Sequence, residues 1–146
     1  MPRLLIAIAL LASLASAATA ATAQDLVGKW AIDGAATWAV LKTSAGMASL
    51  PADRLLQIED AVTKKMDGLP IEITATEMIT EALGTKKAVP YRVLAIDGDV
   101  VTIEGANDAG VVQKSTVTVT DGTLRISQGD NTVVMKKAPT VAIPTK

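Results

Sequence analysis

Residues 51–67 carry one helical stripe of apolar side chains. Leu55, Ile58, Val62 and Met66 recur at spacings of three and four, which places them on a single face of a helix. A proline precedes the stripe, where its fixed φ suits a first helical turn, and a glycine follows it as a stop signal. We therefore predict a helix over this segment, preceded by a shorter helical stretch around residues 35–41.

The rest of the chain follows a period of two. An early apolar run, residues 26–33, has the composition of a first strand, and apolar and polar residues alternate repeatedly after residue 70. Asp-Gly pairs at 97–98 and 121–122 separate alternating runs, a pattern typical of tight hairpins. We expect a mainly β fold: an antiparallel up-and-down meander of about eight strands with a helical insert between the first and second. Such a meander is either a closed barrel or a half-open sheet wrapped over the helix, because free edges recruit other chains.

The chain begins like an exported protein. One arginine, an apolar run over residues 4–15 and a small-residue stretch ending in Ala21-Thr22-Ala23 are typical of a secretory signal. We predict a signal peptide over residues 1–23, a single β-rich domain over 24–137 and a flexible tail over 138–146. The apolar run is too short for a bilayer span of roughly 20 residues, so we expect no stable membrane insertion after cleavage. The location would be periplasmic or secreted.

Composition narrows the chemistry sharply. The chain has no His and no Cys, which excludes the Ser-His-Asp triad, thiolate nucleophiles, disulfides and imidazole-ligated zinc. Basic residues number 14 and acidic residues 15, so we expect no nucleic-acid partner. Asp97 and Asp99 flank a turn glycine, which is hairpin chemistry rather than a calcium site. We expect no metal, no cofactor and no enzymatic activity.

Gly28-x-Trp30 on the first predicted strand, followed by a helical insert and a meander, resembles the calycin superfamily of lipocalins and fatty-acid-binding proteins. The resemblance implies a barrel whose end is closed by Trp30, under a basic side chain from the last strand. Lys136 is the closing residue we assign, and its neighbour Lys137 is an equivalent source of charge. Two features depart from the lipocalin pattern: lysine stands where arginine is usual, and the helix precedes most strands.

The resemblance implies a binding function. We expect an exported lipocalin-like module that holds a small apolar or amphipathic ligand, with Trp38 and Tyr91 as candidate contacts. Core packing is the alternative role for Trp38, and a hydrogen bond to a backbone group is the alternative for Tyr91. Arg92 and Arg125 are predicted to point away from the apolar strand faces, which counts against a fatty-acid head-group site.

The alternative function is a ligand-free structural or protein-interaction domain of the cell envelope. The absence of Phe favours it, since few large aromatic side chains remain to line a pocket. The barrel interior discriminates the two: an apolar cavity above roughly 300 Å³ favours the binder, and a packed interior favours the alternative.

Overall fold

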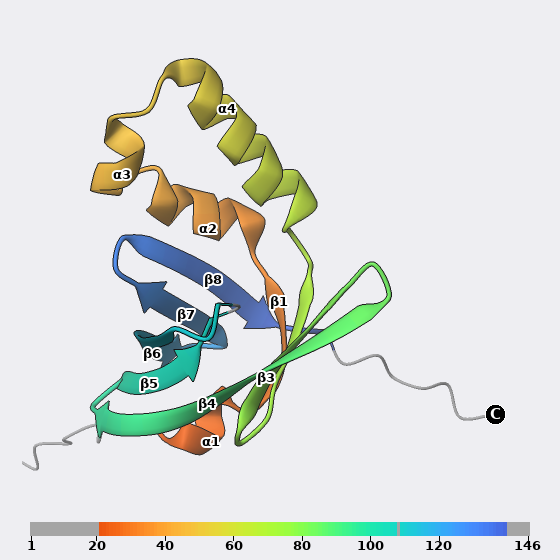
Figure 1. The fold of residues 1–146 in the computed structure, drawn as a ribbon, viewed down its shortest axis with the longest axis vertical. Coiled ribbons are helices and arrows are strands. Elements are labelled where there is room, and N and C mark those ends of the chain that lie inside the picture. Colours follow the sequence, from red (N-terminus) through yellow and green to blue (C-terminus); the bar gives the residue numbers. More distant parts are fainter. Residues whose placement is uncertain (1–20, 108, 140–146) are drawn as a thin grey trace, which may run out of the picture.

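A computed structural model gives the structure of the protein and describes residues 21–107 and 109–139 (Figure 1). Most of the predicted signal peptide, and of the predicted tail, lies outside the described residues. The elements in chain order are α1 (Ala23–Leu26), β1 (Gly28–Ile32), α2 (Gly34–Leu41), α3 (Ala45–Ala48), α4 (Ala52–Asp60), the π-helix η1 (Ala61–Lys65), β2 (Pro70–Ile73), β3 (Glu77–Ala82), β4 (Thr85–Asp97), β5 (Val100–Ala106), β6 (Val112–Thr120), β7 (Thr123–Gln128) and β8 (Asn131–Lys137).

The eight strands form a closed barrel in chain order. Every neighbouring pair is antiparallel, and the barrel closes where Trp30 of β1 lies opposite Lys137 of β8. The predicted mainly β fold, its meander order and its helical insert after the first strand are confirmed. Of the closed and half-open forms, the protein adopts the closed one.

Tight turns produce the meander. Between β6 and β7, Asp121 and Gly122 have φ of 50° and 74°, the positive values that a two-residue hairpin turn requires at both centres. Leu83 and Gly84 make the same turn between β3 and β4, with φ of 52° and 76°. Asp121 suits this backbone and Leu83 does not, so the sequence advertises the first turn more clearly than the second.

The barrel has two different ends. The first, here called the closed end, carries α1 and the β4–β5 and β6–β7 turns. The opposite end, here called the mouth, carries the β5–β6 connection and the β7–β8 turn. Fully buried side chains fill the barrel from the closed end upward: Leu26, Trp30, Ile73, Val101, Val117, Leu124 and Met135.

The helical insert packs outside the barrel, with α2 along β8 and η1 against α2 (Figure 1). The predicted helix over 51–67 is present as α4, which continues into η1. No residue of α4 is buried, whereas Val62 of η1 is. The amphipathic stripe therefore contacts the rest of the molecule mainly through its C-terminal part.

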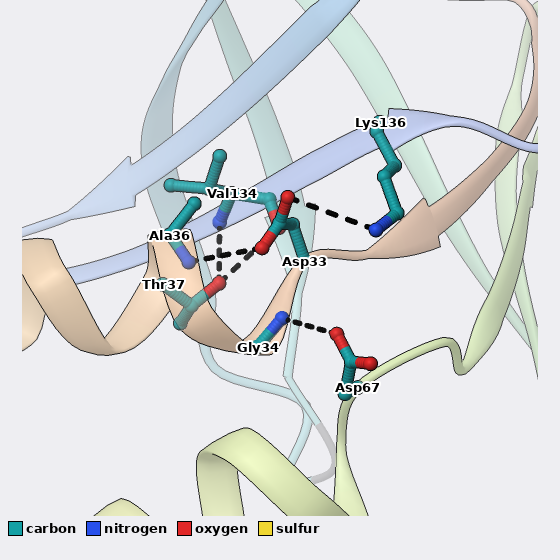
Figure 2. Close-up of polar contacts among 7 residues, drawn as sticks. All are labelled: Asp33, Gly34, Ala36, Thr37, Asp67, Val134 and Lys136. Carbon is teal, nitrogen blue, oxygen red and sulfur yellow. Dashed lines mark hydrogen bonds and ion pairs between the residues drawn. The ribbon is translucent and has the colours of Figure 1, made fainter.

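Figure 2 shows how the start of α2 is fixed to the barrel. The Asp33 carboxylate accepts from the Ala36 N–H at 2.9 Å and so caps the helix. The buried Thr37 hydroxyl donates to the Val134 carbonyl at 3.2 Å and accepts from the Val134 N–H at 2.9 Å. Since β1 pairs with β8 only as far as Met135, Thr37 satisfies the backbone groups of the next residue.

Gly34 permits this close approach. Its N–H donates to the Asp67 carboxylate at 2.8 Å. A Cβ added at Gly34 would lie 2.5 Å from the Val62 carbonyl oxygen, a distance that no side chain tolerates. The glycine thus lets η1 and the segment after it pack directly on the first turn of α2.

Candidate functional site

A small cavity opens inside the barrel at the mouth, with a volume of about 140 Å³. Strand register fixes its walls: Met78 lies opposite Val89, Tyr91 opposite Gly105 and Val117 opposite Ile126, so inward faces from several strands converge. The lining residues are Met78, Val89, Tyr91, Ile103, Gly105, Ala106, Asn107, Gln113, Ser115, Ile126 and Gln128. The walls are apolar on the β3–β5 side and carry polar groups where β6 and β7 reach the mouth.

The polar groups are the distinctive part of this cavity. Gln128 Nε2 donates to Gln113 Oε1 at 2.7 Å, which joins β7 and β6 across the mouth. This bond leaves the second Gln128 N–H, the Gln113 amide donors and the Ser115 hydroxyl as groups with further hydrogen-bonding capacity. Asn107 contributes little, because its side-chain oxygen accepts from the Ala109 and Val111 N–H groups at 3.0 and 2.9 Å.

Tyr91 separates the cavity from the packed interior. Its side chain lines the cavity and also belongs to the buried core. The hydroxyl donates to the Thr74 backbone carbonyl at 2.6 Å. Burial raises the pKa of Tyr91 above its ordinary value of about 10, because the ionised form loses hydration. The hydroxyl therefore already has a backbone partner, and the ring is the part that a ligand would contact.

The other predicted binding residue, Trp38, lies elsewhere. It belongs to α2, outside the barrel, and is half-buried there. It is not among the residues that line the mouth cavity. Trp38 and Tyr91 are therefore not brought together into one site.

At the closed end, Trp30 is fully buried and its Nε1–H donates to the Leu26 carbonyl at 2.9 Å. Lys137 Nζ lies 4.8 Å from the centroid of the Trp30 ring, within cation–π distance. Lys136 instead lies on the outer side of β8, with its Nζ 3.8 Å from the Asp33 carboxylate (Figure 2). The cation above Trp30 therefore comes from Lys137, the second of the two lysines considered from the sequence.

Gly28 completes the closed end. Its φ is 149°, a value that L side chains rarely adopt. A Cβ placed there would lie 3.6 Å from Lys137 Nζ and 3.8 Å from Trp30 Nε1. The Gly-x-Trp motif thus positions glycine, indole and ammonium together.

Hollows on the outer surface are polar and open. One of about 470 Å³ lies over β6 and β7 and is lined by Thr118, Thr120, Asp121, Thr123 and Arg125. These residues are on the solvent side of the sheet, since their neighbours Val119 and Leu124 face the interior. Arg92 also lies on the outer side, where its Nε donates to Glu104 at 2.6 Å. We interpret these features as solvated barrel surface and not as a ligand site.

Sequence reasoning did not single out Gln113, Ser115 or Gln128. A signal for two of them was present, because Gln113 and Ser115 continue the period-two face of Val117 and Val119 toward the mouth. Within the described residues, no group of three or more acidic side chains is arranged to hold a metal ion.

Comparison of the chain with protein-family models, with curated proteins and with solved structures gives no match. Over residues 21–107 and 109–139, none of the helices combines the length and apolar character needed to cross a bilayer.

Proposed function

We propose that the protein is an exported, calycin-like barrel that binds a small amphipathic molecule at its mouth. The mouth cavity carries this proposal, because apolar walls from β3, β4 and β5 face polar groups of Gln113, Ser115 and Gln128. Binding sites for small molecules commonly combine mostly apolar walls with a few fixed polar groups.

The volume limits the ligand. Drug-sized ligands need cavities of roughly 300 Å³ or more, whereas a cavity near 150 Å³ holds a molecule the size of benzene. At about 140 Å³, the mouth cavity suits a small ring or a short chain bearing one polar group. A long fatty acid is too large, and the outward position of Arg92 leaves its carboxylate without that cation.

Calycin membership is part of the same proposal. The Gly28-x-Trp30 motif, the Lys137 ammonium over the indole and the helical insert after β1 support it. Export is supported by the signal-like sequence of residues 1–23.

A nuclear magnetic resonance titration with phenol tests the binding. We expect saturable shifts at the amides of Ile103, Gly105 and Ile126, with a dissociation constant near the millimolar range, about −4 kcal/mol. Decanoate, whose chain exceeds the cavity, should give no saturable shift at the same amides.

Two leucine substitutions provide the matched comparison. Ser115→Leu fills the cavity and should abolish the phenol shifts, whereas Thr116→Leu adds the same side chain on the outer face and should leave them unchanged. Shifts that survive Ser115→Leu would place phenol elsewhere and contradict the proposed site.

The second candidate function is a ligand-free structural or interaction domain of the envelope. The run of fully buried side chains at the closed end favours it, since most of the interior is already filled. The titration separates the two: no saturable phenol shift at the mouth would favour this second function.

A further inference from the structure

Ala21 is an integral part of the folded barrel. It is 8% exposed and packs in the core with Leu26 and Trp30. Its N–H donates to the Gly98 carbonyl in the β4–β5 turn at 2.9 Å. The described chain therefore attaches to the closed end three residues before Gln24, the first residue that follows the signal peptide predicted from sequence.

The next residues organise α1, which plugs the closed end. The Thr22 N–H and hydroxyl donate to Asp25 Oδ2 at 2.6 and 3.0 Å, and the Asp25 N–H donates back to the Thr22 carbonyl at 3.0 Å. The hydrogen bonds from Thr22 hold the pKa of Asp25 below its usual value. This turn places Leu26 in the core, with its carbonyl on the Trp30 indole N–H.

The sequence contains overlapping cleavage motifs. Small residues one and three positions before a bond are what a signal peptidase reads, and Ala15-Ser16-Ala17, Ala18-Thr19-Ala20 and Ala21-Thr22-Ala23 all satisfy this rule. Cleavage after Ala23 would remove both Ala21 and Thr22, and with them every contact described in the two preceding paragraphs.

We propose that processing occurs between Ala20 and Ala21, so that Ala21 becomes the first residue of the mature protein. Water adds across this amide bond: the leader leaves with a carboxylate on Ala20, and Ala21 gains a free α-amine. This inference rests on the export that forms part of the proposed function.

The new amino terminus suits its position. The α-ammonium retains hydrogens to donate to the Gly98 carbonyl, which the Ala21 N–H already contacts. Asp97 and Asp99 flank Gly98 in the β4–β5 turn, so the terminus gains its positive charge beside two acidic residues of adjacent sequence. Their attraction for the terminus supplies a role for this acidic pair beyond turn formation.

Expression of the full precursor in a bacterium with a general secretory pathway tests the proposal, through the intact mass and the N-terminal sequence of the exported protein. We expect a chain that starts Ala21-Thr22-Ala23-Gln24. A start at Ala18 or at Gln24 would overturn the processing position and leave export intact. A chain that stays unprocessed inside the cell would overturn export and this inference together.

A pair of leucine variants sharpens the result. Ala20→Leu puts a large residue directly before the proposed bond and should abolish the Ala21 terminus. Ala23→Leu is the matched control and should leave processing at Ala21 unchanged. Loss of the Ala21 terminus in the control, or its persistence in Ala20→Leu, would contradict the proposed position.

Stability gives a readout independent of the peptidase. Protein that begins at Ala21 should unfold at a higher urea concentration than protein that begins at Gln24, because only the longer form keeps the Ala21 and Thr22 contacts. Equal unfolding midpoints would remove the structural basis of the proposal and overturn it.

Discussion

At the closed end of the barrel, α1 inserts Leu26 beneath Trp30, and Lys137 lies against the indole. At the mouth, the same inward strand faces end in Gln113, Ser115 and Gln128 around a cavity of about 140 Å³. One end is sealed by a large aromatic side chain and a helical plug, and the other is left unfilled by small or polar residues. The comparison separates two tasks: the closed end supplies stability, and the mouth is free to bind.

Loss of the Trp30 side chain is the most severe way to break this comparison. We expect Trp30→Ala to lower the free energy of unfolding by about 3–5 kcal/mol, because it leaves a large cavity and an unpaired Leu26 carbonyl. Urea unfolding followed by circular dichroism measures the loss. Trp38→Ala on α2, where the side chain is half-buried, is the control and should cost about 1 kcal/mol.

Two residues of β7 measure the gradient between the ends. Leu124 is fully buried toward the closed end, while Ile126 on the same face lines the mouth cavity. We expect Leu124→Ala to cost about 3–4 kcal/mol and Ile126→Ala about 2 kcal/mol or less, since the second site already borders empty space. Equal losses in urea unfolding would mean that the mouth is packed as tightly as the closed end.

Tyr91 sits at the boundary, and its titration reports which environment dominates. Because burial raises its pKa, the folded state holds the phenolic proton more tightly than the unfolded chain. This stabilisation is complete below about pH 10, the unfolded pKa, and is lost as pH rises through the higher folded value. Tyr91 is the single tyrosine, so tyrosinate absorbance gives its titration directly, with an expected midpoint above 10.

The control for this titration is Tyr91→Phe. It removes the hydroxyl bond to Thr74, which should cost about 1 kcal/mol, and it should also abolish the tyrosinate signal. A wild-type midpoint at or below the unfolded value would show that solvent at the mouth reaches the hydroxyl.

The smallest expected effect distinguishes the two lysines of β8. Lys137→Met removes the cation over Trp30 and should cost about 0.5–1 kcal/mol. Lys136→Met removes an exposed pairing with Asp33 and should cost about 0.3 kcal/mol. Thermal or urea unfolding of both variants gives the order, and a larger loss for Lys136→Met would contradict the assignment of the closing cation to Lys137.

The meander was readable from sequence because its signals are local. Alternating runs and Asp-Gly pairs state strand and turn without reference to distant residues, as at Asp121-Gly122. The helical stripe after Pro51 likewise predicted α4 and η1. Barrel closure itself was one of two readings, since it depends on β1 meeting β8 from the opposite end of the chain.

The identity of the closing lysine was obscured by packing on both sides of β8. Val133 and Met135 face the interior, but Val134 is also buried, because α2 covers the outer face there. The strand consequently reads as a continuous apolar run, and its alternation, which would assign Lys137 to the inner face, is hidden.

The cavity was less predictable than the fold. Its size depends on how far each inward side chain reaches across the barrel, which pattern alone does not give. The role of residues 21–26 was equally hidden, because Ala21, Thr22 and Ala23 match a cleavage motif and a helix start at once.

Closure of β1 on β8 has a consequence for secretion. A chain that is exported from its amino terminus delivers β1 first and β8 last, so the segment that contains Trp30 waits without its final partner until Lys137 has emerged. Every other strand pair joins neighbours in sequence and can form as the chain appears. Completion of the barrel is thereby coupled to release of the whole chain, and a molecule stalled partway across the membrane exposes two unpaired strand edges.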